Sequence, residues 1–478
     1  MGIAVFFRLQ KNEDILIRYF RINDPYRLVG LLVLLLIIYL PLFIDFPSIT
    51  IPELKDVLLG EKMNEGFALY TEIVDNTGPL AAWLMEFIDT LFGRSMIARH
   101  ILASILIFLQ GAYVGIMLIL RKAFNENTYI PSFLFCLLFF FSYDTLSLSG
   151  ELIGSAFLLL ALNNLFKEIE FRTQRDETVF NLGLYISFAS LFSFAFWIYL
   201  FCIMIVLVFF TRTTARKFSL LVFGFVLPHL LMLTMGYLNG SLGSIWDYYY
   251  VSNLSFERDV FLHTRALLVL GAIPLLYFVI SMIILQREAR FSKYQSLLLQ
   301  VMFLWLSFSF VYLFFCKDLR PQNLIVFIPA LSFILTHFFL FIRRRKFVEL
   351  NAWILFLGIV GGSYLSRYDK LESVDYSALA VSPAKTQYID QRILVLSDQF
   401  DHYRDNQLAT FYLNWRLSEE IFRNPDYYEN LTEVYHAFSK DPPDIVVDPE
   451  NLLRPFLDRS PSLKKIYKRQ GIIYRRSN

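Results

Sequence analysis

The sequence predicts a polytopic α-helical membrane protein with about eleven spans, followed by a small C-terminal α/β domain outside the cytoplasm. Two observations carry this prediction. Apolar residues make up 56% of the 478 residues and charged residues only 18%, a balance that soluble domains rarely reach. The apolar residues also gather in runs of span length, whereas charges are interspersed again after residue 367.

A hydrocarbon core of about 30 Å needs roughly 20 apolar residues in a helix. Runs that approach this length lie at 28–46, 97–120, 129–143, 151–166, 179–195, 197–211, 218–237, 266–286, 296–316, 324–342 and 350–366. We therefore divide the chain into a cytoplasmic N-terminal segment at 1–27, a transmembrane domain at 28–366 and a C-terminal domain at 367–478.

Basic residues occupy every second loop between these runs. They are Arg8, Lys11, Arg18, Arg21 and Arg27 before the first run, then Arg121 and Lys122, Lys167, Arg172 and Arg175, Arg212, Arg216 and Lys217, Arg287, Arg290 and Lys293, and 343–346. Because cytoplasmic loops are enriched in Lys and Arg, these loops and the N-terminus are predicted to be cytoplasmic. The alternate loops and the C-terminal domain then lie on the outer face.

The C-terminal domain has a composition typical of a soluble fold. Runs at 392–397 and 444–448 have strand character, and each leads into sequence that favours a helix. The segment 467–474 places β-prone residues on both sides of Gln470 and Gly471, which predicts a hairpin.

The first outer loop, 47–96, carries an unusual number of carboxylates close to the bilayer. They are Glu53, Asp56, Glu61, Glu65, Glu72 and Asp75. Further along the loop, a spaced pattern is formed by Tyr70, Glu72, Asp75, Pro79 and Leu80, and an amphipathic stretch ends at Phe92 and Gly93. This loop resembles the first periplasmic loop of the GT-C superfamily of polyprenyl-phosphate-dependent glycosyltransferases, which includes protein O-mannosyltransferases and lipid A aminoarabinose transferases.

The resemblance implies that an acidic pair near the start of this loop holds the general base. Glu53 stands at the second position of that pair and Pro52 at the first, so the motif is degenerate. A carboxylate suits the task, because the acceptor must lose a proton and burial near the bilayer raises a carboxyl pKa. Glu53, Glu72 and Asp75 are the candidate catalytic residues. The structural alternative is a solvated loop face whose acids cap helices.

The departing phosphate calls for cations on the same side of the membrane. Lys317 and Arg320 lie in the outer loop before the run 324–342, and Arg258 and His263 lie in the loop before 266–286. An outer arginine runs against the positive-inside bias, so Arg320 is a candidate for bidentate phosphate binding, with an ion pair to a first-loop acid as the alternative. We expect the first-loop acids and Arg320 to line one cavity.

Glu151 opens the run at 151–166, where an ionisable residue is a candidate for substrate binding. The alternative is that its charge complements a helix N-terminus. Neither the cysteines nor the histidines show metal-ligand spacing, so the sequence implies no cofactor and no metal site, although it leaves a divalent metal open. A formal charge of +2 gives no sign of a nucleic-acid partner.

By resemblance, the chain is expected in a bacterial cytoplasmic (inner) membrane as a cell-envelope transferase. It would move a sugar from a polyprenyl-phosphate donor to a lipid, glycan or protein acceptor on the outer face, with membrane lipids as its other partners. The alternative, favoured by Pro52, is a catalytically degenerate GT-C-like scaffold that docks an envelope protein through 367–478. The sequence favours the enzyme without deciding the matter. A transporter is least supported, because the runs contain few ionisable residues.

Overall fold

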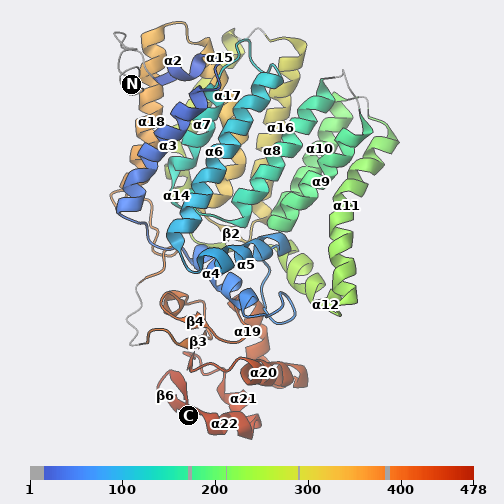
Figure 1. Cartoon of the computed structure of the whole chain (residues 1–478), viewed down its shortest axis with the longest axis vertical. Helices are drawn as coiled ribbons and strands as arrows, with labels where there is room; N and C mark the ends of the chain where they lie inside the picture. Colours follow the sequence, from blue (N-terminus) through green and yellow to red (C-terminus); the bar gives the residue numbers. More distant parts are fainter. Residues whose placement is uncertain (1–15, 171–174, 212, 289–290, 383–387, 478) are drawn as a thin grey trace.

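The computed structural model describes residues 16–170, 175–211, 213–288, 291–382 and 388–477. Within them, a helical bundle carries a smaller C-terminal unit, 388–477, at one end (Figure 1). Most of the predicted N-terminal segment, 1–15 with Arg8 and Lys11, lies outside the described residues, as do Arg172, Arg212 and Arg290.

The bundle consists of long helices that run between its two ends, together with shorter helices such as α2 and α14 (Figure 1). They are α2 (Leu16–Arg21), α3 (Arg27–Ile44), α6 (Met96–Leu120), α7 (Ile130–Leu138), α8 (Gly150–Ile169), α9 (Asp176–Phe192), α10 (Ile198–Phe210), α11 (Ala215–Leu238), α14 (Thr264–Leu270), α15 (Ala272–Glu288), α16 (Lys293–Phe315), α17 (Ile328–Phe341) and α18 (Arg345–Arg367). Every predicted apolar run overlaps one of these helices or, at 266–286, the pair α14 and α15.

Short elements connect the helices. They are the 3-10 turns η1 (Phe139–Phe141), η2 (Asp144–Leu146), η3 (Phe194–Trp197) and η5 (Pro321–Phe327), the π-helix η4 (Trp246–Val251) between α12 (Leu242–Ile245) and α13 (Ser252–Leu254), and the strands β1 (Asp259–Val260) and β2 (Asp318–Leu319). β1 and β2 pair in parallel and join two loops at the same end of the bundle.

In the described part of the chain, seven helices are long and apolar enough to cross a membrane, or eight if α14 and α15, bent by 66°, form one span. The protein is therefore a multi-pass membrane protein. The other predicted spans fall on α7, α9 and α10, which are shorter helices. The number eleven stays a prediction, because these three helices do not reach span length.

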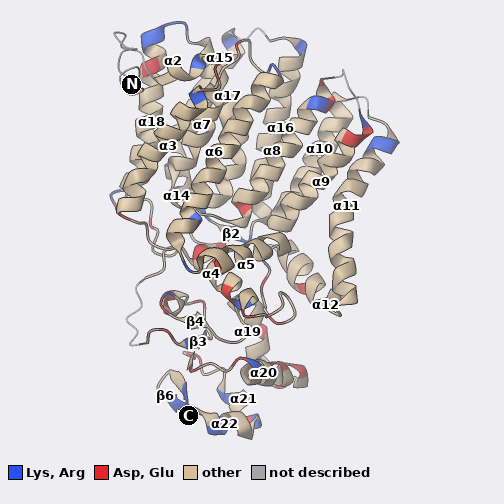
Figure 2. Ribbon diagram, viewed as in Figure 1, with Lys and Arg blue, Asp and Glu red and all other residues tan. Residues whose placement is uncertain are grey.

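Charged residues gather at the two ends of the bundle and are almost absent along its middle (Figure 2). This distribution suits a hydrocarbon layer around the middle, where an ionised side chain is costly. The start of α18, which falls within the basic segment 343–346, lies at the end opposite the C-terminal unit (Figure 1).

Two further helices, α4 (Ile51–Asn64) and α5 (Pro79–Phe92), lie across the end of the bundle, between it and the C-terminal unit (Figure 1). A capping box begins α4, because the Thr50 hydroxyl accepts from the backbone N–H of Glu53 and the Glu53 carboxylate accepts from that of Thr50. The predicted first outer loop is thus largely helical, and we call α4, α5 and the segment between them the α4–α5 layer.

The C-terminal unit is built on a five-stranded sheet with the strand order β4-β3-β5-β7-β6. The strands are β3 (Arg392–Val395), β4 (Gln407–Leu408), β5 (Ile445–Val447), β6 (Tyr467–Gln470) and β7 (Ile473–Arg476), and the helices are α19 (Trp415–Arg423), α20 (Tyr428–Lys440), α21 (Arg454–Arg459) and α22 (Pro461–Ile466). β3 pairs in parallel with β4 and β5, whereas β7 pairs antiparallel with β5 and β6. β3, β5 and the β6–β7 hairpin lie where the sequence predicts them.

The C-terminal unit is docked onto the α4–α5 layer by backbone and side-chain contacts. The backbone N–H of Val74 donates to the carbonyl of Phe411 at 2.8 Å, and that of Asn414 donates to the carbonyl of Val74 at 3.0 Å. Nearby, the ammonium of Lys62 lies 2.5 Å from the carboxylate of Asp441, and both residues are 1% exposed. A buried ion pair therefore holds the two parts together.

Replacing Lys62 by Met is expected to destabilise the protein by about 3 kcal/mol, because the buried Asp441 carboxylate would keep only the more exposed Arg392, 2.9 Å away, as a charged partner. Thermal unfolding of the purified protein measures the loss. Lys464→Met, which breaks a solvent-exposed pair with Asp458, is the matched control and should cost about 0–1 kcal/mol. Adding Asp441→Asn to Lys62→Met should recover part of the loss. A double variant as unstable as the single one would contradict the assignment.

Candidate functional site

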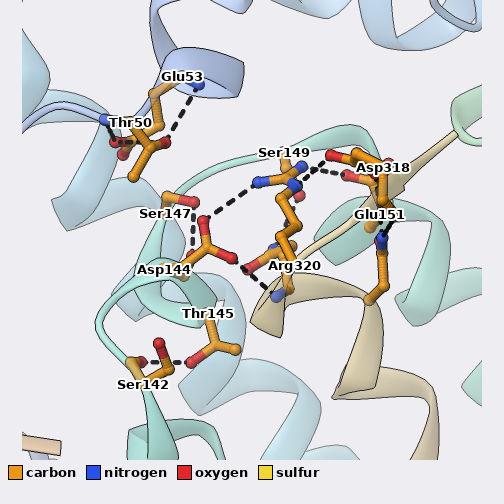
Figure 3. A network of polar contacts seen from close by, with 12 residues as sticks. Thr50, Glu53, Ser142, Asp144, Thr145, Ser147, Ser149, Glu151, Asp318 and Arg320 are labelled. Atoms are coloured by element: carbon orange, nitrogen blue, oxygen red, sulfur yellow. Dashed lines mark hydrogen bonds and ion pairs between the residues drawn. The ribbon is translucent and has the colours of Figure 1, made fainter. Parts of the chain in front are cut away.

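Arg320 lies at the centre of a buried polar network at the end of the bundle, between β2 and η5 (Figure 3). It is 4% exposed. Its guanidinium lies 3.3 Å from Asp144, 3.2 Å from Glu151 and 2.5 Å from Asp318. Three carboxylates thus surround one cation, and the network carries an excess of negative charge.

Local structure explains how these carboxylates reach Arg320. Asp144 begins η2, Glu151 lies in the first turn of α8, and Asp144 accepts from the backbone N–H of Gln322 at 2.8 Å. The side-chain amide of Gln322 donates to the hydroxyl of Ser149, the N-cap of α8, at 2.8 Å. Burial raises the pKa of Asp144 to about 6, although the charge of Arg320 and the bond from Gln322 oppose the shift.

Next to this network lies a cavity of about 250 Å³, which we call the main cavity. The bundle, the α4–α5 layer and the C-terminal unit all contribute to its wall. The charged residues that line it are Lys55, Asp56, Asp75, Glu151, Glu257, Asp259, Lys317, Asp318, Arg320 and Arg416. Groups that are far apart in the sequence therefore share one polar space.

Asp56 lines the main cavity from α4, although the sequence did not single it out among the first-loop acids. Burial and the neighbouring charge of Glu151 raise its pKa to about 8, and Arg320 and Arg99 only partly offset this rise. A carboxyl group with this pKa can take a proton from an acceptor near neutral pH. Sequence spacing could not separate Asp56 from Glu53, since positions three apart lie near one another on a helix.

Asp75 also lines the main cavity and is 3% exposed. Its carboxylate accepts from the side-chain amide of Asn414 at 3.3 Å and from the backbone N–H of Thr77 at 3.2 Å. On the other side of the turn, Asn253 donates to the backbone carbonyl of Asn76 at 2.8 Å. Contacts from the bundle and from the C-terminal unit thus fix the direction of this carboxylate.

Glu53 and Glu72 are not among the described residues that line the main cavity. Glu53 lies 3.0 Å from the Nε2 atom of His100 and accepts from Thr50. Burial alone would raise the pKa of Glu53, but His100 and the bonds from Thr50 lower it. Glu72 pairs with Lys440 of α20. The expected convergence of these two carboxylates with Arg320 is therefore wrong, because Glu53 is engaged by Thr50 and His100 and Glu72 is engaged by Lys440.

Two lysines supply the ammonium groups of the main cavity, Lys55 and the predicted Lys317. Lys317 donates to the carbonyl and the hydroxyl of Ser255 at 2.8 and 2.7 Å, and burial lowers its pKa to about 8 against the charge of Glu257. The Lys55 ammonium lies 5.2 Å from the ring centroid of Phe400. Within the described residues, neither lysine forms an ion pair with a carboxylate.

The remaining predicted residues divide between the wall of the main cavity and other places. Glu151 lines it and holds Arg320, whereas Arg258 and His263 are absent from its described lining. Arg258 donates to the carbonyl of Leu313 at 3.2 Å, and His263 is the exposed N-cap residue of α14.

The C-terminal unit adds Asn414, Arg416 and Leu417 to the main cavity, and Arg416 pairs with Asp259. No local signal in the sequence marks these residues. Within the described ranges, no group of three or more His, Cys, Asp or Glu side chains is arranged to hold a metal ion.

The fold resembles that of solved membrane proteins. The crystal structure of ArnT from Cupriavidus metallidurans bound to undecaprenyl phosphate aligns with a TM-score of 0.55 over 93% of this chain and 98% of that one, at 10% sequence identity. The oligosaccharyltransferase AglB from Archaeoglobus fulgidus, in complex with an inhibitory peptide and a dolichol-phosphate, aligns with a TM-score of 0.48 over 95% of this chain and 74% of that one, at 11% identity. The chain thus shares the overall fold of ArnT.

Residues 80–370 match the model of a family of unknown function, DUF6427, and the chain belongs to this family. The match runs from the first turn of α5 to just beyond α18. No curated protein matches the chain in sequence.

Asp56→Asn is expected to raise the melting temperature near neutral pH. The pKa of Asp56 is raised from its ordinary 3.8 to about 8. The stability that the protonated Asp56 contributes is therefore fully present below pH 3.8 and is lost as the pH rises through about 8. The gain over the wild type should therefore grow between pH 5 and pH 8, to roughly 2–4 °C if about 1 kcal/mol is recovered. Thermal unfolding across this range measures it, with the exposed Asp247→Asn as control. A difference independent of pH would contradict the shift.

Proposed function

We propose that this protein is a membrane glycosyltransferase that moves a sugar from a polyprenyl-phosphate carrier to a lipid, glycan or protein acceptor. The observation that carries the proposal is the main cavity, where the carboxyl groups of Asp56 and Asp75 share one space with the ammonium groups of Lys55 and Lys317. The likeness of the whole fold to a protein crystallised with undecaprenyl phosphate supports the carrier class.

The proposed reaction needs a base and an anion site. The acceptor hydroxyl or amine attacks the anomeric carbon, its proton passes to a carboxylate, and the bond from that carbon to the phosphate oxygen breaks. Asp56 suits the base, since its pKa of about 8 lies close to the operating pH. Asp75, which Asn414 holds in place, is suited to orient the acceptor.

The leaving phosphate would be held by Lys317 and Lys55. As compact cations without a carboxylate partner in the described part of the chain, they have charge to offer to an anion. Arg320 is different, because Asp144, Glu151 and Asp318 already surround its guanidinium. Its proposed role is to hold the cavity wall and to moderate the pKa of Asp56.

A strain that carries Asp56→Asn is expected to transfer sugar more slowly by a factor of about 10² to 10⁴, because a general base is lost. Mass spectrometry of lipid extracts should show accumulation of sugar-linked polyprenyl phosphate, and envelope glycan should fall. Glu72→Gln, on a carboxylate outside the main cavity, is the matched control. In the wild type, the rate should rise toward about pH 8 as Asp56 loses its proton, and should fall above that pH as Lys317 loses the charge that holds the phosphate. Normal envelope glycan in Asp56→Asn at unchanged abundance would overturn the assignment of the base.

The cavity end of the bundle is proposed to face away from the cytoplasm. Single cysteines at Ser462 and Arg344, both exposed, in a variant without Cys136, Cys202 and Cys316, test this. A membrane-impermeant thiol reagent should label the Ser462 position in intact spheroplasts and the Arg344 position only after permeabilisation, since the basic segment 343–346 lies at the opposite end of the bundle. The reverse pattern would invert the topology.

The scaffold alternative is favoured by one observation, the use of Glu53 and Glu72 in structural contacts. If it holds, Asp56→Asn and Asp75→Asn are both tolerated in cells, whereas deletion of 368–478 disrupts an envelope complex. The transferase predicts loss of function from both kinds of change, so the point variants decide between the two.

A further inference from the structure

The last part of the C-terminal unit is strongly basic. Between residues 454 and 476 the sequence has eight basic residues and one acidic residue, whereas the formal charge of the whole chain is only +2. All eight basic residues are exposed: Arg454, Arg459, Lys464, Lys465, Lys468, Arg469, Arg475 and Arg476. They belong to α21, α22, β6 and β7, and these elements lie at the end of the unit that is remote from the bundle (Figures 1 and 2).

Half of these cations have no carboxylate partner within the described residues. The other half pair with Asp426, Asp444 and Asp458. We call the four that do not pair the hairpin cations, and they are Lys465, Lys468, Arg469 and Arg475. Their charge is therefore available to an anionic ligand.

Two of the hairpin cations lie directly opposite each other. Lys468 of β6 is the cross-strand partner of Arg475 of β7, and opposite residues of an antiparallel pair share one face of the sheet. The Arg475 guanidinium lies 5.3 Å from the ring centroid of Tyr388. Like charges in this arrangement repel each other, so an anionic group bound beside them would relieve the repulsion.

β6 is also an open edge of the described sheet, because it pairs only with β7. The backbone N–H of Ser477 donates to the carbonyl of Ile466 at 2.7 Å, so the alternate residues Lys468 and Gln470 turn their backbone groups toward β7 as well. Arg469, between them, then turns its N–H and carbonyl outward. An edge with outward backbone groups can accept an added strand.

The alternative is that the charges serve only to prevent unwanted pairing, since lysine on an edge strand often does so. This explains Lys468 alone. It does not explain Arg475, because β7 is paired on both sides, nor Lys465, which lies on α22 before the strand. The same charges that repel a second copy of β6 attract a strand of opposite sign.

The surroundings of the hairpin cations limit the kind of partner. Their distance from the bundle in Figure 1 argues against the headgroups of the protein's own membrane. Within 454–476 the exposed large apolar side chains are those of Ile466 and Ile472, so the surface lacks the aromatic anchors that a folded protein partner usually buries. An extended acidic segment needs no such anchor, because ladder hydrogen bonds and charge supply its affinity.

We propose that β6 binds an extended acidic polypeptide segment of another protein as an added strand, with its carboxylates on the hairpin cations. Alternate residues of such a strand share a face, so acidic residues at every second position would lie along Lys468 and Arg475. The proposal goes beyond sugar transfer and does not depend on the chemistry of the main cavity.

Binding of a labelled peptide of about ten residues, in which Glu and Thr alternate, tests the proposal. Fluorescence anisotropy with the purified full-length protein in detergent measures its affinity. Replacing all four hairpin cations by Gln should lower the affinity by a factor of about 10 or more, because four exposed charge contacts are lost. The matched control replaces Arg343, Arg344, Arg345 and Lys346 by Gln, which removes the same charge from exposed residues at the opposite end of the bundle. Its affinity should stay within about 2-fold of the wild type.

Two further comparisons separate an added strand from simple attraction between charges. Arg469→Pro removes the outward N–H and should bind about 5-fold more weakly than Arg469→Gln, because a ladder hydrogen bond is lost. A peptide of the same sequence with N-methyl groups at alternate residues tests the ladder without altering the protein, and it should bind at least about 5-fold more weakly than its parent.

Several outcomes would overturn the proposal. No binding of the Glu–Thr peptide at about 1 mM would exclude the site, and equal losses in the two fourfold variants would show a response to net charge alone. Equal affinity of the parent and N-methylated peptides would exclude strand addition. If polygalacturonate then also bound as tightly as the peptides, the surface would be one for acidic glycans instead.

Discussion

The contact on which the site depends is the burial of Arg320 among three carboxylates. A guanidinium that is 4% exposed needs anionic partners, because removing a charge from water costs far more than one hydrogen bond returns. These partners come from η2, from the first turn of α8 and from β2. Three segments far apart in the sequence are therefore held in one position, and two of the carboxylates, of Glu151 and Asp318, remain in the wall of the main cavity.

A second constraint is that the α4–α5 layer is held from both sides. Asn253 holds the turn before α5 from the bundle, and Asn414 holds it from the C-terminal unit. The buried pair of Lys62 and Asp441 fixes the same unit at the end of α4. Docking of the C-terminal unit is thus part of the assembly of the main cavity, since Asp75 would lose a hydrogen-bond partner without it.

The sequence predicts the features that depend on local pattern. Long apolar runs give the helices of the bundle, and short β-prone runs give β3, β5 and the β6–β7 hairpin. The presence of Arg320 in a loop predicted to lie on the outer face also marks it as a candidate site residue. Its three partners are not predictable, since none belongs to the first outer loop and two come from other bundle segments.

Local sequence patterns cannot tell whether Glu53 or Asp56 lines the main cavity, because both residues lie on α4 and differ only in their surroundings. Glu53 meets His100 and the hydroxyl of Thr50, which hold it as an anion, whereas Asp56 faces Glu151 across the main cavity. An isolated Arg320 would draw the pKa of Asp56 down and make it a weak base. Surrounded by Asp144, Glu151 and Asp318, the same cation offsets only part of the rise. Burial and the charge of Glu151 thus leave Asp56 with a pKa of about 8, because the partly neutralised Arg320 offsets only part of the rise.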